Sequence, residues 1–303
     1  MNSSREPIQT ALPPVVSLEE FIRRTSGQNR FLVLDCHEGN FFEPGLDHFQ
    51  VEESKRFRMP VHTVEGGEKD PLLVHLDNEF ADMLMEAALE EIVEDCLHTV
   101  LGPRNIAAFI SSVKGPEHLV RNFVQAARVR LEIRDKKSTA FRFFDPRVMH
   151  TLQRLFNPPQ MAMLLGPVTY WGYVDFRGQF RLVENISPRR SLSSVVIRKE
   201  QAIVLRRNAT VQKALQQLKR YRADWPENLD AVLDGHVERA PQDLRELTRV
   251  EGREENLATY AALCWLRDTG RIEGQLIEQA LAEHRKSSAS LVAVIENLSP
   301  ELF

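Results

Sequence analysis

The residues most typical of an enzyme lie in one short stretch, Asp35-Cys36-His37-Glu38. This stretch directly follows the apolar run Phe31-Leu32-Val33-Leu34, which predicts a buried strand. The ends of strands carry the active sites of many α/β proteins, so an enzyme with its site at Asp35–Glu38 is one alternative. The competing interpretation is structural, because polar residues must follow wherever a buried strand meets a loop.

Other combinations of reactive residues do not form recognisable sites. The nine His are scattered, and none belongs to an HExxH motif or to a His/Cys cluster with metal-ligand spacing. The sequence contains no GxGxxG, GxxxxGK[ST] or GxSxG motif, and Ser111-Ser112 has no acid or base beside it. We therefore predict no catalytic residues, no metal and no cofactor.

The most distinctive motif is Phe141-Arg142-Phe143-Phe144-Asp145-Pro146-Arg147. Asp145 is a good helix N-cap, and Pro146 suits the first helical position. Arg142 and Arg147 flank the carboxylate, and either can pair with it. Downstream lie Gly166-Pro167 and Trp171. These residues predict a corner between a strand and a helix, in which Phe141, Arg142, Phe144, Asp145, Pro146, Arg147, Gly166, Pro167 and Trp171 are structural.

Hydrophobic periodicity predicts the elements that hold this motif. After a polar tail, Ser17 predicts the cap of a short helix, with Glu20 as its capping-box partner. Apolar positions at helical spacing predict helices over 77–101, 116–126 and from Asp145 to the Pro158-Pro159 pair. Further strands are predicted over 72–76, 106–111, 129–133, 139–144, 161–168, 169–175 and 178–184.

The pattern changes after a polar, basic linker at 188–194. Helical periodicity predicts helices over 199–222, 256–266 and 272–284, with no convincing strand after about residue 205. We predict an α+β protein, in which a mixed α/β N-terminal lobe with a small sheet precedes an all-helical C-terminal lobe. The predicted parts are a tail with a short helix (1–30), the α/β lobe (31–186) and the helical lobe (195–303).

Charge is distributed in three blocks along the chain. Residues 1–103 carry a net charge of −12, residues 104–222 of +16 and residues 223–303 of −8, although the whole chain carries only −4. The basic block makes nucleic-acid binding an alternative function. Its aromatic residues, however, lie in predicted strands and are expected in the core. The acidic face of helix 77–101 is expected to be solvated, and the alternative is a docking surface for a basic segment such as this chain's own central block. The three blocks suggest the hypothesis that acidic and basic parts of the chain dock onto each other and form a charged groove for a protein partner.

The composition also indicates a compartment. No apolar run approaches the ~18 residues of a membrane helix, and the N-terminal residues contain no apolar segment typical of a secretory signal. Cys36, Cys96 and Cys264 are odd in number and far apart, which does not suit a disulfide framework. We expect a cytoplasmic protein that does not bind membranes.

The motif and its surroundings resemble one family. Residues 141–147 are similar to the signature of the bacterial type VI secretion adaptor-chaperones, the domain-of-unknown-function 4123 family. Four further segments resemble that family in the same order. They are Leu32–Asp35, Pro71–Leu76, Phe109–Ser112 with Glu117–Leu119, and Leu165–Val168 with Trp171. The resemblance covers about residues 31–180.

The resemblance implies a function that composition alone does not suggest. Such proteins are cytoplasmic adaptors without known enzymatic activity. They bind a specific toxic effector and help to load it onto the secretion spike, VgrG, or its PAAR tip. The helical lobe, which the resemblance barely covers, would recognise the partner. Candidate partner-binding residues there are Arg206, Arg207, Arg220, Tyr221 and Trp225.

Overall fold

The computed structural model describes residues 12–36, 42–61, 70–98, 104–132, 138–188, 195–245, 250–287 and 289–302. The chain separates into two compact units. The first consists of Met1–Leu97 with Pro103–Ala202, and the second of His98–Gly102 with Ile203–Phe303. Each unit is described separately below.

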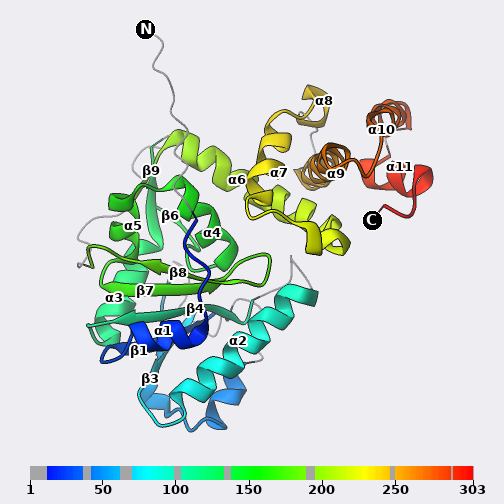
Figure 1. Cartoon of the computed structure of the whole chain (residues 1–303). Helices are drawn as coiled ribbons and strands as arrows, with labels where there is room; N and C mark the ends of the chain where they lie inside the picture. Colours follow the sequence, from blue (N-terminus) through cyan, green and yellow to red (C-terminus); the bar gives the residue numbers. More distant parts are fainter. Residues whose placement is uncertain are drawn as a thin grey trace. The chain divides into compact units, whose positions relative to one another are not determined.

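A six-stranded antiparallel sheet forms the centre of the first unit. Its strands are β1 (Asn29–Leu34), β2 (Arg56–Arg58), β3 (Leu72–Leu76), β4 (Ile106–Ser112), β7 (Val168–Val174) and β8 (Phe180–Glu184). Their order is β2-β3-β1-β4-β7-β8, and Figure 1 shows β8, β7, β4, β1 and β3 following one another down this unit. The central strand β1 is apolar throughout its buried part because it is covered on both faces.

One face of the sheet is covered by α1 (Leu18–Arg24) and α2 (Ala81–His98). Side chains of both helices share a core with alternate residues of the strands, among them Leu32, Phe109 and Phe180. Two short 3₁₀ helices, Glu43–Asp47 and Glu53–Lys55, lie in the segment between β1 and β2. The helix predicted over 77–101 is confirmed as α2, although it begins at Ala81, because residues 78–80 form a bend and a turn before it.

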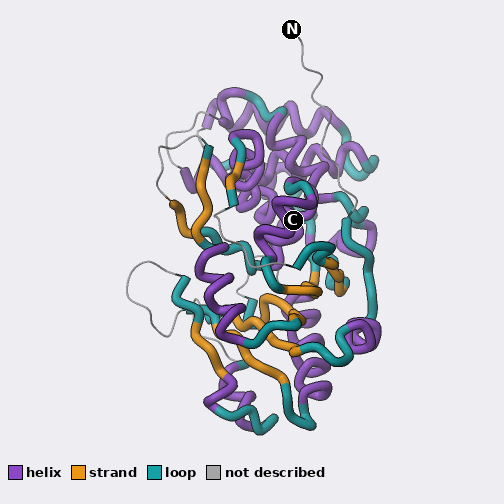
Figure 2. The backbone as a smooth tube through the Cα atoms, turned by 90° about the vertical axis from the view of Figure 1, so that its left-hand side faces the viewer, coloured by secondary structure: helices purple, strands orange, loops and turns teal. Residues whose placement is uncertain are grey.

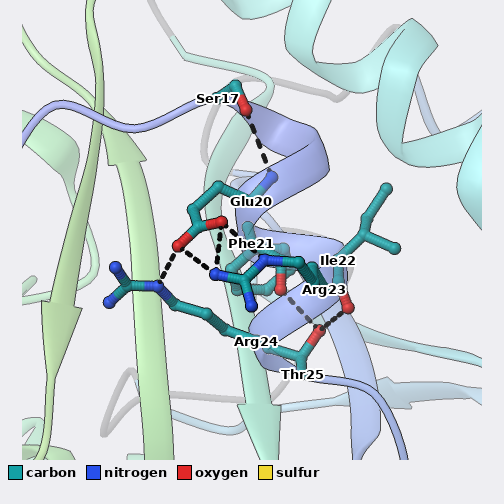
Figure 3. Close-up of polar contacts among 7 residues, drawn as sticks. All are labelled: Ser17, Glu20, Phe21, Ile22, Arg23, Arg24 and Thr25. Carbon is teal, nitrogen blue, oxygen red and sulfur yellow. Dashed lines mark hydrogen bonds and ion pairs between the residues drawn. The ribbon is translucent and has the colours of Figure 1, made fainter.

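The start of α1 shows which predicted cap contacts form (Figure 3). Ser17 accepts a hydrogen bond from the backbone N–H of Glu20 at 3.1 Å, as the sequence predicted. The carboxylate of Glu20, expected to return to the N-cap backbone, instead binds Arg23 and Arg24 at 2.7–2.8 Å. Basic residues one turn ahead offer this carboxylate charge-assisted hydrogen bonds, which are stronger than a bond to a neutral amide.

The other face carries α3 (Pro116–Ala126), α4 (Pro146–Leu155) and α5 (Pro158–Leu165). The rings of Phe123 and Phe143 lie 5.6 and 5.8 Å from that of Trp171, and Phe143, Phe144, Trp171 and Tyr173 are all buried. The prediction that these aromatic residues belong to the core is confirmed, while Phe141 and Tyr170 are half-buried.

A second sheet in this unit has three short strands, β6 (Ser138–Ala140), β5 (Arg128–Leu131) and β9 (Val196–Ile197). The antiparallel β5–β6 pair corresponds to the strands predicted over 129–133 and 139–144. The second strand was predicted to reach Phe144, but it ends at Ala140, and residues 143 and 144 form a turn. Their aromatic side chains pack into the core from this irregular backbone, so burial there does not require a strand.

The prediction of a strand over 161–168 was wrong, since most of that segment belongs to helix α5. Asn157 and Gln160 form a reciprocal capping box, and Pro158 occupies the first helical position. The Pro158-Pro159 pair thus follows the end of α4 and also begins the next helix. A short apolar run without periodicity does not distinguish a buried strand from a buried helix.

Helices and turns make up the described part of the second unit (Figure 1; Figure 2). It contains most of α6 (Lys199–Gln217), a 3₁₀ helix (Lys219–Asp224), α7 (Leu229–Glu238), α8 (Gln242–Arg245), α9 (Val250–Asp268), α10 (Gly274–Ser287) and α11 (Leu291–Leu298). Leu215, Leu233 and Leu263 are among its fully buried side chains. A mixed α/β part followed by a helical part confirms the predicted α+β class.

Candidate functional site

Asp145 organises the corner that the sequence singled out. Its carboxylate caps α4 by accepting from the backbone N–H of Arg147 at 2.9 Å. The same carboxylate accepts from the Nε and Nη2 atoms of Arg147 at 2.9 and 2.7 Å. Of the two arginines that flank Asp145 in sequence, Arg147 is therefore the one that forks onto it.

Arg142 binds a different carboxylate, that of Asp35 at the end of β1. Its guanidinium also lies 5.3 Å from the centroid of the Phe144 ring. The backbone N–H of Asp35 donates to the carbonyl of Asn105 at 2.9 Å. The corner thus ties the central strand to the turn before α4, across more than a hundred residues of sequence.

The carboxylate of Asp145 and the guanidinium group of Arg147 stabilise each other in their charged forms. Burial by itself would raise the pKa of Asp145, but the hydrogen bonds and charge of Arg147, together with the charge of Arg142, hold this pKa below its ordinary value. Burial also raises the pKa of the Cys36 thiol to about 11. At neutral pH Cys36 is therefore a protonated thiol and Asp35 is held in an ion pair. His37 and Glu38 lie outside the described residues.

Gly166-Pro167 forms the tight turn between α5 and β7. Gly166 has φ +58°, and a Cβ atom there would lie 2.0 Å from Oδ1 of Asn122. The amide of Asn122 donates to the carbonyls of Leu164 and Leu165, and Ser112 donates to the carbonyl of Pro167 at 2.8 Å. Only glycine fits this backbone conformation and this close approach.

A cluster of arginine and aromatic side chains lies in the second unit. The guanidinium carbons of Arg220 and Arg271 each lie 4.9 Å from the centroid of the Tyr221 ring. The Tyr221 and Trp265 rings are 6.2 Å apart, and Arg271 also lies 5.9 Å from the Trp265 ring. Arg271 pairs with Asp224 at 2.5 Å. We call Arg220, Tyr221, Trp265 and Arg271 the arginine–tyrosine cluster.

The remaining predicted partner-binding residues lie in different environments. Arg206 is exposed on α6, and it has no ion pair within the part of the chain that the structure describes. Arg207 binds both carboxylate oxygens of Asp234 at 2.6 and 2.8 Å. Trp225 is only 2% exposed, beneath Arg222, so its side chain contributes to the core of the unit. The structure thus brings Arg220 and Tyr221 together but not the other three.

Several residues of these sites were missed in the sequence. Trp265 lies in α9 and Arg271 in the bend that follows it, far in sequence from Tyr221, so their approach to Tyr221 has no local signal. The buried pair of Asp175 and Arg181, at 2.6 Å, was also missed. A signal existed there, because Asp175 lies just before the turn at Arg177-Gly178 and accepts a hydrogen bond from the backbone N–H of Arg177.

The described residues lack two further kinds of feature. They contain no group of three or more His, Cys, Asp or Glu side chains that could hold a metal ion. Among the helices described, none is long and apolar enough to cross a membrane.

Comparison with known proteins gave one match. Residues 68–163 match the family model described as a domain of unknown function (DUF4123). The matched segment runs from just before β3 almost to the end of α5, and so includes the Asp145 corner. Curated proteins gave no match, and solved structures gave none either. Over residues 68–163, therefore, the chain contains a DUF4123 domain.

Proposed function

We propose that this protein is a non-enzymatic adaptor-chaperone of a type VI secretion system. It binds one toxic effector in the cytoplasm and helps to load it onto the VgrG spike or its PAAR tip. The observation that carries this proposal is the DUF4123 match over residues 68–163, which includes the motif at 141–147. The family resemblance in that motif is the link to secretion.

In this proposal the Asp145 corner is part of the scaffold. Asp145 and Asp35 each bind an arginine, and the Cys36 thiol is protonated at neutral pH. The charged groups of this corner thus serve to join β1 to the start of α4. Their role is to hold the shape of the domain.

The effector would bind the second unit at the arginine–tyrosine cluster. Tyr, Trp and Arg are the residue types that contribute most at protein interfaces. Arg220 and Arg271 are held against Tyr221, so binding would cost them less conformational entropy than free arginines. The cluster carries two arginines and one neighbouring carboxylate, Asp224. This positive excess favours an acidic surface on the effector.

Co-purification tests this proposal. The protein is expressed with the toxin encoded by a neighbouring gene, and the toxin is expected to co-purify. Tyr221→Ala combined with Arg271→Ala should reduce the recovered toxin at least tenfold. Lys286→Ala, at an exposed position of α10, is the control and should leave recovery unchanged.

Secretion provides the second measurement. Deleting the gene for this protein should abolish export of that toxin and leave other secreted effectors unaffected. Normal export of the toxin from the deletion strain would contradict the proposed function.

A further inference from the structure

β8 is an edge strand, and part of its outer edge is already covered by an extended segment. The backbone N–H of Val16 donates to the carbonyl of Phe180 at 3.0 Å, and that of Leu182 donates to Pro14 at 3.2 Å. Val15 lies opposite Arg181 in this antiparallel arrangement. The outer edge of β8 therefore accepts an added strand.

This pairing stops at two prolines. Pro14 has no N–H with which to reach the carbonyl of Leu182, and Pro13 precedes it. Backbone groups that point outward alternate along an antiparallel strand, so after Leu182 the next outward pair belongs to Glu184. Within the described residues, the N–H and carbonyl of Glu184 have no backbone partner on this edge. On the outer edge of β8, the unpaired backbone groups of Glu184 thus directly follow the paired ones of Phe180 and Leu182.

An apolar pocket lies beside this free edge. It has a volume of about 600 Å³, including space open to solvent, and lies between the end of β8 and the α4–α5 corner. Apolar side chains dominate its lining, including Phe156, Met161, Leu165 and Val183. Ile186 is 75% exposed on its rim, the largest exposed fraction among the big apolar side chains of the described residues.

We propose that an extended segment of the effector adds to β8 next to Glu184 and places apolar side chains in this pocket. Alternate side chains of an added strand point to one face of the sheet, which is the face on which Val183 lines the pocket. Glu184 is exposed and forms no ion pair in the described part of the chain, and Arg24, a cation that interacts with its charge, already binds Glu20. A basic residue opposite Glu184 on an added strand is therefore favoured. This inference rests on the proposed function, because the effector is the partner.

The test uses the complex of the full-length protein with the co-purified toxin. The amide N–H of Leu182 is already bound to Pro14, and that of Asn185 to Thr169, so the informative amide is that of Glu184. Its hydrogen exchange is expected to slow at least tenfold in the complex. Ile186→Asp should weaken toxin binding at least tenfold. Val113→Asp is the matched control, since Val113 is an exposed apolar residue of the same unit, at 63%, and lies outside the pocket.

The possible results separate the inference of strand addition at β8 from the proposed adaptor function. If the toxin co-purifies but exchange at the Glu184 amide is unchanged, this inference fails and the proposed function stands. If no toxin co-purifies, both fail. If the Glu184 amide is already protected in the free protein, and a variant lacking residues 1–11 loses that protection, the chain itself occupies the edge and the inference is overturned.

Discussion

At the scale of a single residue, Asp145 combines two stabilising roles. Its carboxylate satisfies a backbone N–H at the start of α4 and also neutralises Arg147, both in a buried place. A cap is worth about 0.5–2 kcal/mol. Removing one partner of a buried ion pair costs about 3–5 kcal/mol, because the other charge is left uncompensated. The second effect is the larger one, although Arg147 remains partly exposed.

We therefore expect Asp145→Ala to lower the free energy of unfolding by about 2–4 kcal/mol. Denaturant unfolding at pH 7 measures this change. Asp82→Ala is the control, because that carboxylate is 55% exposed and pairs with Arg30 at the surface, where an ion pair contributes about 0–1 kcal/mol. Equal stability of the Asp145 variant and the wild type would contradict the assigned role.

The same residue predicts a dependence on pH. Because the pKa of Asp145 is lower in the folded protein than in the unfolded chain, its contribution is complete above the unfolded pKa and is lost as pH falls through the folded pKa. Between pH 6 and pH 3.5 the wild type should thus lose more stability than Asp145→Asn. An equal loss in both proteins would show that this carboxylate is not linked to folding.

At the scale of the element, the turn from α5 to β7 depends on Gly166. We expect Gly166→Ala to lower the free energy of unfolding by about 2 kcal/mol or more, since the positive φ and the contact with Asn122 both oppose a Cβ atom. Gly252→Ala, in the helix α9 and without atoms near its Cβ position, should be neutral or stabilising by up to about 1 kcal/mol. Thermal or denaturant unfolding of both variants makes the comparison, and equal effects would contradict it.

Most elements could be predicted because their signals are local. Periodicity marked α2 and α3, and cap chemistry marked α1 and α4. The wrong prediction of a strand over 161–168 also has a local cause, because this apolar segment suits a buried helix as well as a buried strand. The corner at 141–147 was recognised, but not the partner of Arg142, because Asp35 is distant in sequence. The pocket beside β8 requires knowledge of three elements at once and has no sequence signal.

At the scale of the whole molecule, the charge blocks are partly paired with one another. From the basic block, Arg142 binds Asp35 of the first acidic block, while Arg207 and Lys213 bind Asp234 and Glu254 of the last one. The acidic face of α2 was expected to be solvated or, as the alternative, to pair with the basic block. Its Asp82 binds Arg30 instead, which belongs to the first block.

Each of the two compact units contains fully buried apolar side chains of its own, which predicts two transitions in scanning calorimetry. Asp145→Ala should lower the melting temperature of one transition. Leu263→Ala, which removes a buried side chain of α9 and costs about 2–5 kcal/mol, should lower that of the other. A single transition that both variants shift equally would show that the units unfold together.

The outer edge of β8 has a consequence for the protein before it meets a partner. An unpaired edge strand is a template for association between copies of the same chain, and such association leads to aggregation. Two features oppose it: the prolines at 13 and 14 limit the pairing, and the exposed charge of Glu184 repels a second copy at the same position. The carboxylate of Glu184 on this edge would thus help to keep the protein from aggregating while remaining attractive to a basic partner.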